Sequence, residues 1–411
     1  MTLLRIALRN VLKNRRRSLI TVLAIAFGFM AVAMFKGYVH QAYEKISLAV
    51  VFREIPGHLA VFKEGFLSEG RIRPESFLFT ADEAAALTEV VVRMPEVLWV
   101  GEKLELTGLI SNGDVSTIFL SDALDPAKEE ELLRHYGYRA IPERSPLPVG
   151  RPDAILVGDG LMDLLKLRPE DGVVLMTTTQ YGQMNAADAT VVGTRATFSD
   201  ELSDKYAKLP LGLAKDLYDI TGCDRLCVLT TRFSDLAPIR ERIREAASEL
   251  GMALEIRTWD ELSQYYQKAK DFLDVVFFFL FCITAVIVVM GTVNTMSMAV
   301  YERTREIGTL RAIGLKPRGV LALFSMEGAI LGILGGLAGL GLTALGRLAV
   351  AAAQITYRPP GVGEDILIEI DLVPEVLLVS GLAFVLLSVV AAALPARRAA
   401  RQPIVDALGH V

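Results

Sequence analysis

Cysteine and histidine are scarce in this chain of 411 residues, which holds three of the first and four of the second. Cys282 lies inside an apolar run, whereas Cys223 and Cys227 stand four positions apart in a more polar region. If Cys227 begins a strand, this pair cannot easily reach disulfide geometry, so we expect free thiols. Two cysteines without a neighbouring histidine make no convincing zinc site, and we expect no metal ligands.

The sequence motifs of common catalytic sites are missing as well. The chain has no G-x-x-x-x-G-K-[ST] loop for phosphates, no H-E-x-x-H and no G-x-S-x-G. Two of the four histidines, His40 and His58, lie near the first apolar run, so acid–base catalysis has few candidates. We therefore predict no catalytic residue and no cofactor bound by this chain. The apolar runs also lack the series of charged residues that an ion pathway would show.

Charge is distributed unevenly along a chain that is 52% hydrophobic and has a mean hydropathy of +0.40. Residues 39–271 contain 38 acidic and 26 basic side chains, and the remainder contains 10 acidic and 17 basic ones. A basic apolar part that carries an acidic body is typical of an asymmetric membrane protein. Nucleic acid is excluded as a partner, because its phosphates would repel that body.

Four apolar runs are long enough to cross a bilayer, for which about 20 residues suffice. We predict a membrane protein with four transmembrane α-helices and a large α+β extracytoplasmic domain inserted between helices 1 and 2. The predicted segments are an amphipathic N-terminal helix (1–17), helix 1 (18–38), the extracytoplasmic domain (39–271), helix 2 (272–300), a cytoplasmic loop (301–319), helix 3 (320–355), a short outer loop (356–373), helix 4 (374–395, ended by Pro395) and a cytoplasmic tail (396–411).

Lysine and arginine counts set the expected orientation in the cell (inner) membrane. Six precede the first span, five lie in the loop 301–319, and three follow Pro395. The loop 356–373 has Arg358 against four acidic residues. By the positive-inside rule, both termini and the loop 301–319 are cytoplasmic, and the domain 39–271 is outside. Anionic lipids should attract the basic N-terminal helix.

The domain 39–271 alternates between strand and helix patterns. Thr80 with Glu83 three positions later predicts a capping box and a helix that begins there. A turn at 111–114 separates two predicted strands, and we expect one subdomain of this domain to be inserted into another. The stretch from Gly57 to Phe66 predicts a short strand with a glycine turn, at an edge of the sheet.

A short charged segment, Glu302–Gly314, lies between the second and third apolar runs. Arg303 and Glu306 are three positions apart and can pair on one helix face. Ile307, Leu310 and Gly314 form the predicted apolar strip of a surface helix. We interpret this helix as a docking surface for a soluble partner; the alternative is an ordinary basic loop that serves membrane topology.

This segment, Glu302-Arg303-x-x-Glu306-Ile307-Gly308-x-Leu310-Arg311-Ala312-x-Gly314, resembles a signature of the MacB/FtsX/LolC family of ABC-transporter permeases (type VII). The tail from Pro395 to Gly409 resembles the C-terminal signature of the same family. The resemblance implies an inserted subdomain near 122–216, as in MacB-type members. It also implies a coupling helix that sits in a groove of a separate ATPase subunit. The residues it assigns to that coupling are Glu302, Arg303, Arg305, Glu306, Ile307, Leu310, Arg311 and Gly314.

The resemblance also implies a function, in which ATP hydrolysis in the partner moves the extracytoplasmic domain by mechanotransmission. ATP and Mg would bind the ATPase, and the permease would pair with a second copy or a paralogue. The segment from Gly57 to Phe66 resembles the lipoprotein-releasing branch, which favours lipoprotein transport. The alternatives are MacB-like efflux of peptides or drugs, FtsX-like regulation of a cell-wall hydrolase, and a membrane sensor or scaffold without an ATPase.

The third apolar run carries glycines at helical spacing. Small residues spaced four apart let helices approach closely in lipid. The positions are Gly328, Gly332, Gly335, Gly336 and Gly339. They could form a dimer or bundle seam, or pack within the chain. Glu327, about two turns into this run, is expected to have a polar partner or to lie at the membrane interface.

Overall fold

The computed structural model describes residues 2–408 except 55, 71, 137–146, 196, 198–199, 232, 234 and 358–365. The chain forms two compact units. The helical unit comprises 1–44, 269–356 and 367–411, and the mixed unit comprises 45–268 and 357–366. Arg358 of the predicted outer loop and Gly409 of the tail signature lie outside the described residues.

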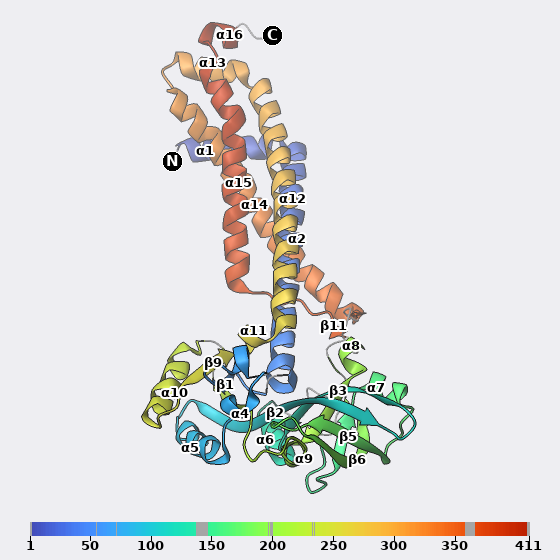
Figure 1. Ribbon diagram of the computed structural model, residues 1–411. Helices are drawn as coiled ribbons and strands as arrows, with labels where there is room; N and C mark the ends of the chain where they lie inside the picture. Colours follow the sequence, from blue (N-terminus) through green and yellow to red (C-terminus); the bar gives the residue numbers. More distant parts are fainter. Residues whose placement is uncertain are drawn as a thin grey trace. The chain divides into compact units, whose positions relative to one another are not determined.

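Four long helices run alongside one another in the helical unit (Figure 1). The elements are α1 (Thr2–Lys13), α2 (Arg15–Ala49), α12 (Gln264–Glu302), α13 (Thr304–Ala312), α14 (Pro317–Ala353), α15 (Pro374–Arg401) and α16 (Ile404–Leu408), with a ribbon of β10 (Thr356–Tyr357) and β11 (Ile366–Leu367). Helices α2, α12, α14 and α15 are long and apolar enough to cross a membrane, which confirms the four predicted spans. The mixed unit follows α2 and precedes α12 in the sequence, as predicted.

The long helices extend beyond their predicted limits. Helix α2 continues past residue 38, and α12 begins before residue 272. The prediction that Pro395 ends the fourth span is wrong, because α15 runs through it to Arg401. Pro395 removes one backbone hydrogen bond, but it is buried among the small side chains Ala392 and Ala396, and packing of that kind holds a helix together across a proline.

The glycines of α14 bring helices of the same chain together. Gly328 and Gly332 approach α15, and Gly335 and Gly339 approach α2, so closely that an added Cβ would lie under 3.0 Å from a neighbouring atom. These four positions therefore pack within the chain, which was one of the two alternatives. Gly336 has no atom within 4 Å of its Cβ position and is left for contacts outside the chain.

The mixed unit contains a nine-stranded sheet in the order β3-β7-β4-β6-β5-β2-β8-β1-β9 (Figure 1). Its strands are β1 (Leu59–Lys63), β2 (Val97–Ser111), β3 (Ser116–Leu124), β4 (Ala154–Val157), β5 (Asp171–Thr178), β6 (Met184–Thr194), β7 (Tyr206–Pro210), β8 (Arg225–Thr230) and β9 (Leu254–Thr258). The β3–β7 and β4–β6 pairs are parallel, and the other paired strands run antiparallel.

Short helices connect or flank these strands. They are the π-helix η1 (Val50–Glu54), α3 (Phe66–Glu69), α4 (Pro74–Phe77), α5 (Ala81–Val92), α6 (Pro126–Tyr136), α7 (Asp159–Leu164), α8 (Asp200–Ser203), α9 (Leu211–Tyr218), α10 (Ala237–Glu249) and α11 (Trp259–Leu262). The predicted capping box is confirmed, because Thr80 and Glu83 exchange backbone hydrogen bonds at the start of α5.

Strand β2 passes through both hydrophobic cores of this unit. Trp99 and Val100 belong to a core with β1, β8, α5 and α10, whereas Leu104 and the residues after it belong to a core with β4, β5, α7 and α9. The predicted subdomain near 122–216 therefore begins too late, because the second core starts at Leu104 and residue 122 lies inside β3. An unbroken strand offers no change of pattern in the sequence to mark that border.

Buried ion pairs lie where β2 and β3 pair. Lys103 Nζ is 3.2 Å from Asp122 Oδ1, and Lys208 Nζ is 3.0 Å from Asp122 Oδ2. Lys103 Nζ also donates a 2.7 Å hydrogen bond to the carbonyl of Glu54. Burial alone would lower the pKa of Lys103, but the carboxylates of Asp122 and Glu105 outweigh it and raise that pKa. The lysine stays charged because ionised carboxylates lie beside it.

We expect Lys103→Met to destabilise the mixed unit. The substitution leaves part of a buried carboxylate and the partly buried Glu54 carbonyl without their donor, at a cost of roughly 3 kcal/mol. Lys128→Met is the matched control, since the Lys128–Glu131 pair is exposed and contributes below about 1 kcal/mol. Thermal unfolding of the detergent-purified variants measures both losses of stability. Equal losses in Lys103→Met and Lys128→Met would contradict the stabilising role of the buried pair.

His58 is a buried structural residue in the turn before β1. Its Nδ1 accepts a 3.1 Å hydrogen bond from the Thr230 amide, so the ring is neutral. Burial lowers the pKa of His58 to about 4. The expectation of an edge strand after Gly57 is wrong, because β1 pairs with β8 on one side and β9 on the other.

The low pKa of His58 predicts loss of stability in acid. Between about pH 6.5 and 4 the unfolded chain takes up a proton that the folded chain excludes, so unfolding becomes easier by up to about 3 kcal/mol as pH falls. His58→Gln should remove this contribution to the pH dependence of stability between about pH 6.5 and 4, whatever the stability of the variant at neutral pH. Thermal unfolding temperatures measured across that pH range test this prediction. If the variant lost as much stability in acid as the unchanged chain, the low pKa would not explain the acid sensitivity.

Candidate docking site

Both ends of α13 are fixed by local sequence. Arg303 interrupts the helical path after α12 and occupies the N-cap position. At the other end Gly314 has φ +109°, a conformation that favours glycine. The Leu315 amide donates to the Leu310 carbonyl at 3.0 Å, and the Gly314 amide donates to the Arg311 carbonyl at 3.1 Å. This pair of bonds is a Schellman motif, which ends the helix before α14.

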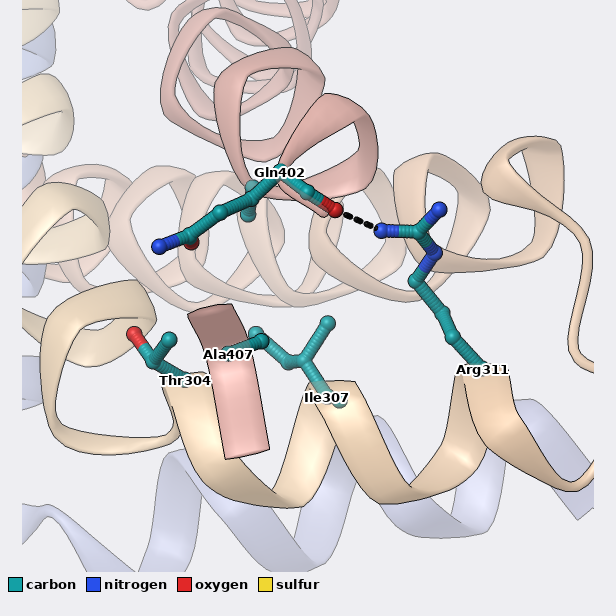
Figure 2. A pocket seen from close by; sticks show the side chains of 7 residues that line it. Thr304, Ile307, Arg311, Gln402 and Ala407 are labelled. Atoms are coloured by element: carbon teal, nitrogen blue, oxygen red, sulfur yellow. Dashed lines mark hydrogen bonds between the residues drawn. The ribbon is translucent and has the colours of Figure 1, made fainter. Parts of the chain in front are cut away.

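One face of α13, here called the inner face, packs on the C-terminal segment of the chain. Figure 2 shows Ile307 and Arg311 pointing toward that segment, and a guanidinium nitrogen of Arg311 donates to the Gln402 carbonyl. The residues that line this contact are Thr304, Ile307, Gly308 and Arg311 of α13 with Ala399, Gln402 and Ala407. The contact holds α13 against the ends of α15 and α16.

The opposite face of α13, here called the outer face, is exposed. Its members are Arg305, Glu306, Thr309 and Leu310, with Ile313 directly after the helix. Leu310 is 40% exposed and Ile313 is 80% exposed. The predicted strip of Ile307, Leu310 and Gly314 is wrong, because Ile307 is buried on the inner face while Leu310 points outward. The spacing of apolar residues could not show which of the two helix faces packs against the rest of the chain.

A buried carboxylate connects α13 to the interior of the helical unit. Glu327 on α14 is 3% exposed. Its Oε1 accepts a 2.6 Å hydrogen bond from the side-chain amide Nδ2 of Asn10 in α1, and it lies 3.0 Å from Arg303 Nη1. Arg303 Nε also lies 3.2 Å from Glu306 Oε2. We call Asn10, Arg303 and Glu327 the Glu327 cluster; it joins the N-cap of α13 to α1 and α14.

Glu327 also faces a small polar cavity among α1, α2, α12 and α14. The residues that line it are Asn10, Val11, Asn14, Arg17, Ser18, Thr295, Met296, Ala299, Glu327 and Leu331. Thr21 and Thr295 form a 2.7 Å hydrogen bond between α2 and α12. Polar contacts of this kind fix helix positions where the surroundings are apolar.

The predicted site residues separate into four groups. Leu310, Arg305 and Glu306 are on the outer face. Ile307 and Arg311 are on the inner face, while Arg303 and Gly314 fix the helix ends. Glu302 lies on α12 instead, where its carboxylate is 2.7 Å from Arg17 of α2.

Sequence reasoning missed three members of the arrangement. Asn10 and Gln402 lie about 300 and 90 positions from their partners, so no local spacing could find them. Ile313 was omitted, although its position seven after Glu306 puts both on one helix face. The arrangement as a whole can bind a protein surface, since it combines exposed apolar side chains with exposed charges on a short, firmly seated helix.

The part of the chain that contains α13 is similar to known proteins. Residues 278–404 match the family described as FtsX-like permease C-terminal. An uncharacterized ABC transporter permease of Methanocaldococcus jannaschii is 24% identical over 421 residues, which cover 98% of this chain and 96% of that protein. The lipoprotein-releasing system transmembrane protein LolC of Xylella fastidiosa is 26% identical over 278 residues, which cover 62% of this chain and 64% of LolC.

A solved structure of the periplasmic region of MacB from Actinobacillus actinomycetemcomitans is also similar. It has a TM-score of 0.37 and 11% sequence identity, and the match covers 52% of this chain and 95% of that structure.

The Glu327 cluster makes a prediction about paired substitutions. Arg303→Leu should strongly lower the thermal unfolding temperature, because removing one partner of a buried ion pair costs about 3–5 kcal/mol. Arg303→Leu with Glu327→Leu should be more stable than Arg303→Leu alone, since no uncompensated charge remains. Glu306→Gln is the matched control, because it removes the exposed partner of the same arginine. A double variant less stable than the single one would contradict the pairing.

Proposed function

We propose that the chain is the permease subunit of an ABC transporter, on the premise that residues 278–404 match the family described as FtsX-like permease C-terminal. Helix α13 is its coupling helix, and a separate ATPase subunit docks on the outer face. ATP and Mg bind that subunit, and this chain hydrolyses nothing. The observation that carries the proposal is a short helix seated firmly by its inner face while Leu310 and Ile313 remain exposed on the other.

The chemistry of the outer face supports a protein partner. Two apolar side chains, Leu310 and Ile313, lie beside Glu306 and Arg305, which are also exposed. Apolar anchors surrounded by charged groups are the usual composition of a protein interface. A helix that served membrane topology alone would need the positive charges but neither the exposed apolar pair nor the buried attachment of its inner face.

The Glu327 cluster supports a mechanical role. A displacement of α13 acts first on its N-cap, Arg303, and through the 3.0 Å ion pair on Glu327 of α14. Helix α14 packs tightly on α15 through Gly328 and on α2 through Gly339. A shift of α13 therefore reaches three long helices. The ATPase would change the populations of two bundle arrangements according to its affinity for each.

The remaining parts of the proposal concern placement and assembly. Both termini and α13 face the cytoplasm and the mixed unit lies outside the cell (inner) membrane, which the basic residues around α1, α13 and α15 favour. The permease works as a dimer with a second copy or a paralogue, for which the open side of Gly336 offers a close-approach position. The exposed apolar face of α1 contacts membrane lipids, with Leu4 55% and Leu8 47% exposed.

Lipoprotein transport is the proposed task of the transporter. The support is the alignment to LolC over 278 residues and the resemblance of the segment from Gly57 to Phe66 to that branch. That segment also has a structural explanation, since Gly57 has φ +112° and His58 is buried. Peptide or drug efflux is the second candidate. Reconstitution with a lipid-modified protein and with a peptide substrate separates the two.

We expect Ile313→Asp to abolish docking of the ATPase while the permease still folds and inserts. A buried, unpaired carboxylate in the interface would cost several kcal/mol, and ATP hydrolysis stimulated by the permease would fall at least tenfold. The measurement is co-purification with an ABC ATPase, recognised by its phosphate-binding loop, and its ATP hydrolysis in detergent.

Val405→Asp is the matched control for that experiment. Val405 in α16 is also 80% exposed, but it lies outside the outer face of α13. The control should bind and stimulate the ATPase as the unchanged chain does. If Ile313→Asp retained the ATPase, the docking assignment would be wrong; if no ABC ATPase bound the unchanged chain, the chain would be a sensor or scaffold instead.

A further inference from the structure

Three metal-binding side chains from two distant segments converge at the C-terminal half of α2. His40 and Glu44 are four positions apart and lie on one face of the helix. Asp371 comes from the segment that precedes α15. One ligand atom from each of the three lies within 4.8 Å of the others, and His40 Nδ1 is 3.3 Å from Asp371 Oδ2. All three belong to the helical unit.

The backbone holds the aspartate segment in place. Gly37 lies about one helical turn before His40. A Cβ at this position would be 2.3 Å from the Asp371 carbonyl oxygen. The Asp371 amide donates a 3.4 Å hydrogen bond to the Gly37 carbonyl. Nearby, Gln41 Nε2 donates a 2.6 Å hydrogen bond to Glu369 Oε2. The close approach that glycine allows therefore sets Asp371 opposite His40 before any ion arrives.

The ligand set selects the class of ion. One imidazole nitrogen and two carboxylates suit a divalent transition metal, whereas calcium and magnesium prefer six or more oxygen ligands. With metal–ligand bonds of about 2.0–2.2 Å, tetrahedral zinc places its ligand atoms roughly 3.4 Å apart, close to the His40–Asp371 distance. The two carboxylates balance the charge of the ion. Because His40 and Asp371 are partly exposed, water can fill the fourth position.

We propose that His40, Glu44 and Asp371 form a zinc site that ties α2 to the segment leading into α15. The site is separate from α13 and does not depend on the proposed function. Zinc replaces the direct contact between His40 and Asp371 by bonds to a shared ion, with the imidazole neutral and the carboxylates ionised. The ion then links α2 to the segment that leads into α15, beside the close packing of Gly37 against that segment.

The test is zinc titration of the full chain in detergent, with any affinity tag removed and metal stripped by a chelator. Isothermal calorimetry should show one zinc ion per chain, with much weaker heats for magnesium and calcium. His40→Ala and Asp371→Asn should each weaken zinc binding at least tenfold. Zinc should raise the thermal unfolding temperature of the unchanged chain and leave that of both variants unchanged.

His135→Ala is the matched control, because His135 is an exposed histidine of α6 outside this cluster. It should bind zinc as the unchanged chain does. Since His40 is about half exposed and Asp371 about one-third exposed, both variants should fold, which their unfolding temperatures without zinc will show. Absence of zinc binding, or binding that persists in His40→Ala and Asp371→Asn, would overturn the proposal.

Discussion

An ionised carboxylate inside an apolar helix bundle is stabilised by a positive partner, and in this protein that partner caps a surface helix. Glu327 is almost fully buried, and Arg303 reaches it from the start of α13. Because an uncompensated charge there is costly, the position of α13 is bound to that of α14. The same arginine also contacts Glu306 on the helix surface. One side chain therefore links the exposed face of the molecule to its interior.

Much of the fold follows from patterns that are visible in the sequence. Four apolar runs became four long helices, and the Thr80–Glu83 pair marked the start of α5. The misplaced limits have physical causes. Pro395 was taken as a helix end because a proline lacks an amide donor, yet small neighbours allow α15 to continue around it. The border between the two cores was missed because it falls within a single strand, β2.

Local sequence patterns predicted only part of the candidate site. The charged segment, its helix ends and the Arg303–Glu306 pair follow from local spacing. Which face the chain covers itself does not, because the covering residues Gln402 and Ala407 are distant in the sequence. The partner of Glu327 was expected as a polar group, but only the fold identifies Arg303 and Asn10. Contacts of this kind depend on how separate helices pack together, and the periodicity of residues within one helix gives no information about that packing.

Strand β2 has a consequence for how the mixed unit bears load. Its 15 residues run through both hydrophobic cores without interruption. Tension applied to one core reaches the other along peptide bonds, which are far stiffer than side-chain packing. The lysine–carboxylate pairs beside Lys103 brace the sheet where the two cores adjoin. If the mixed unit is pulled, we therefore expect its two cores to be displaced together rather than to hinge apart within β2.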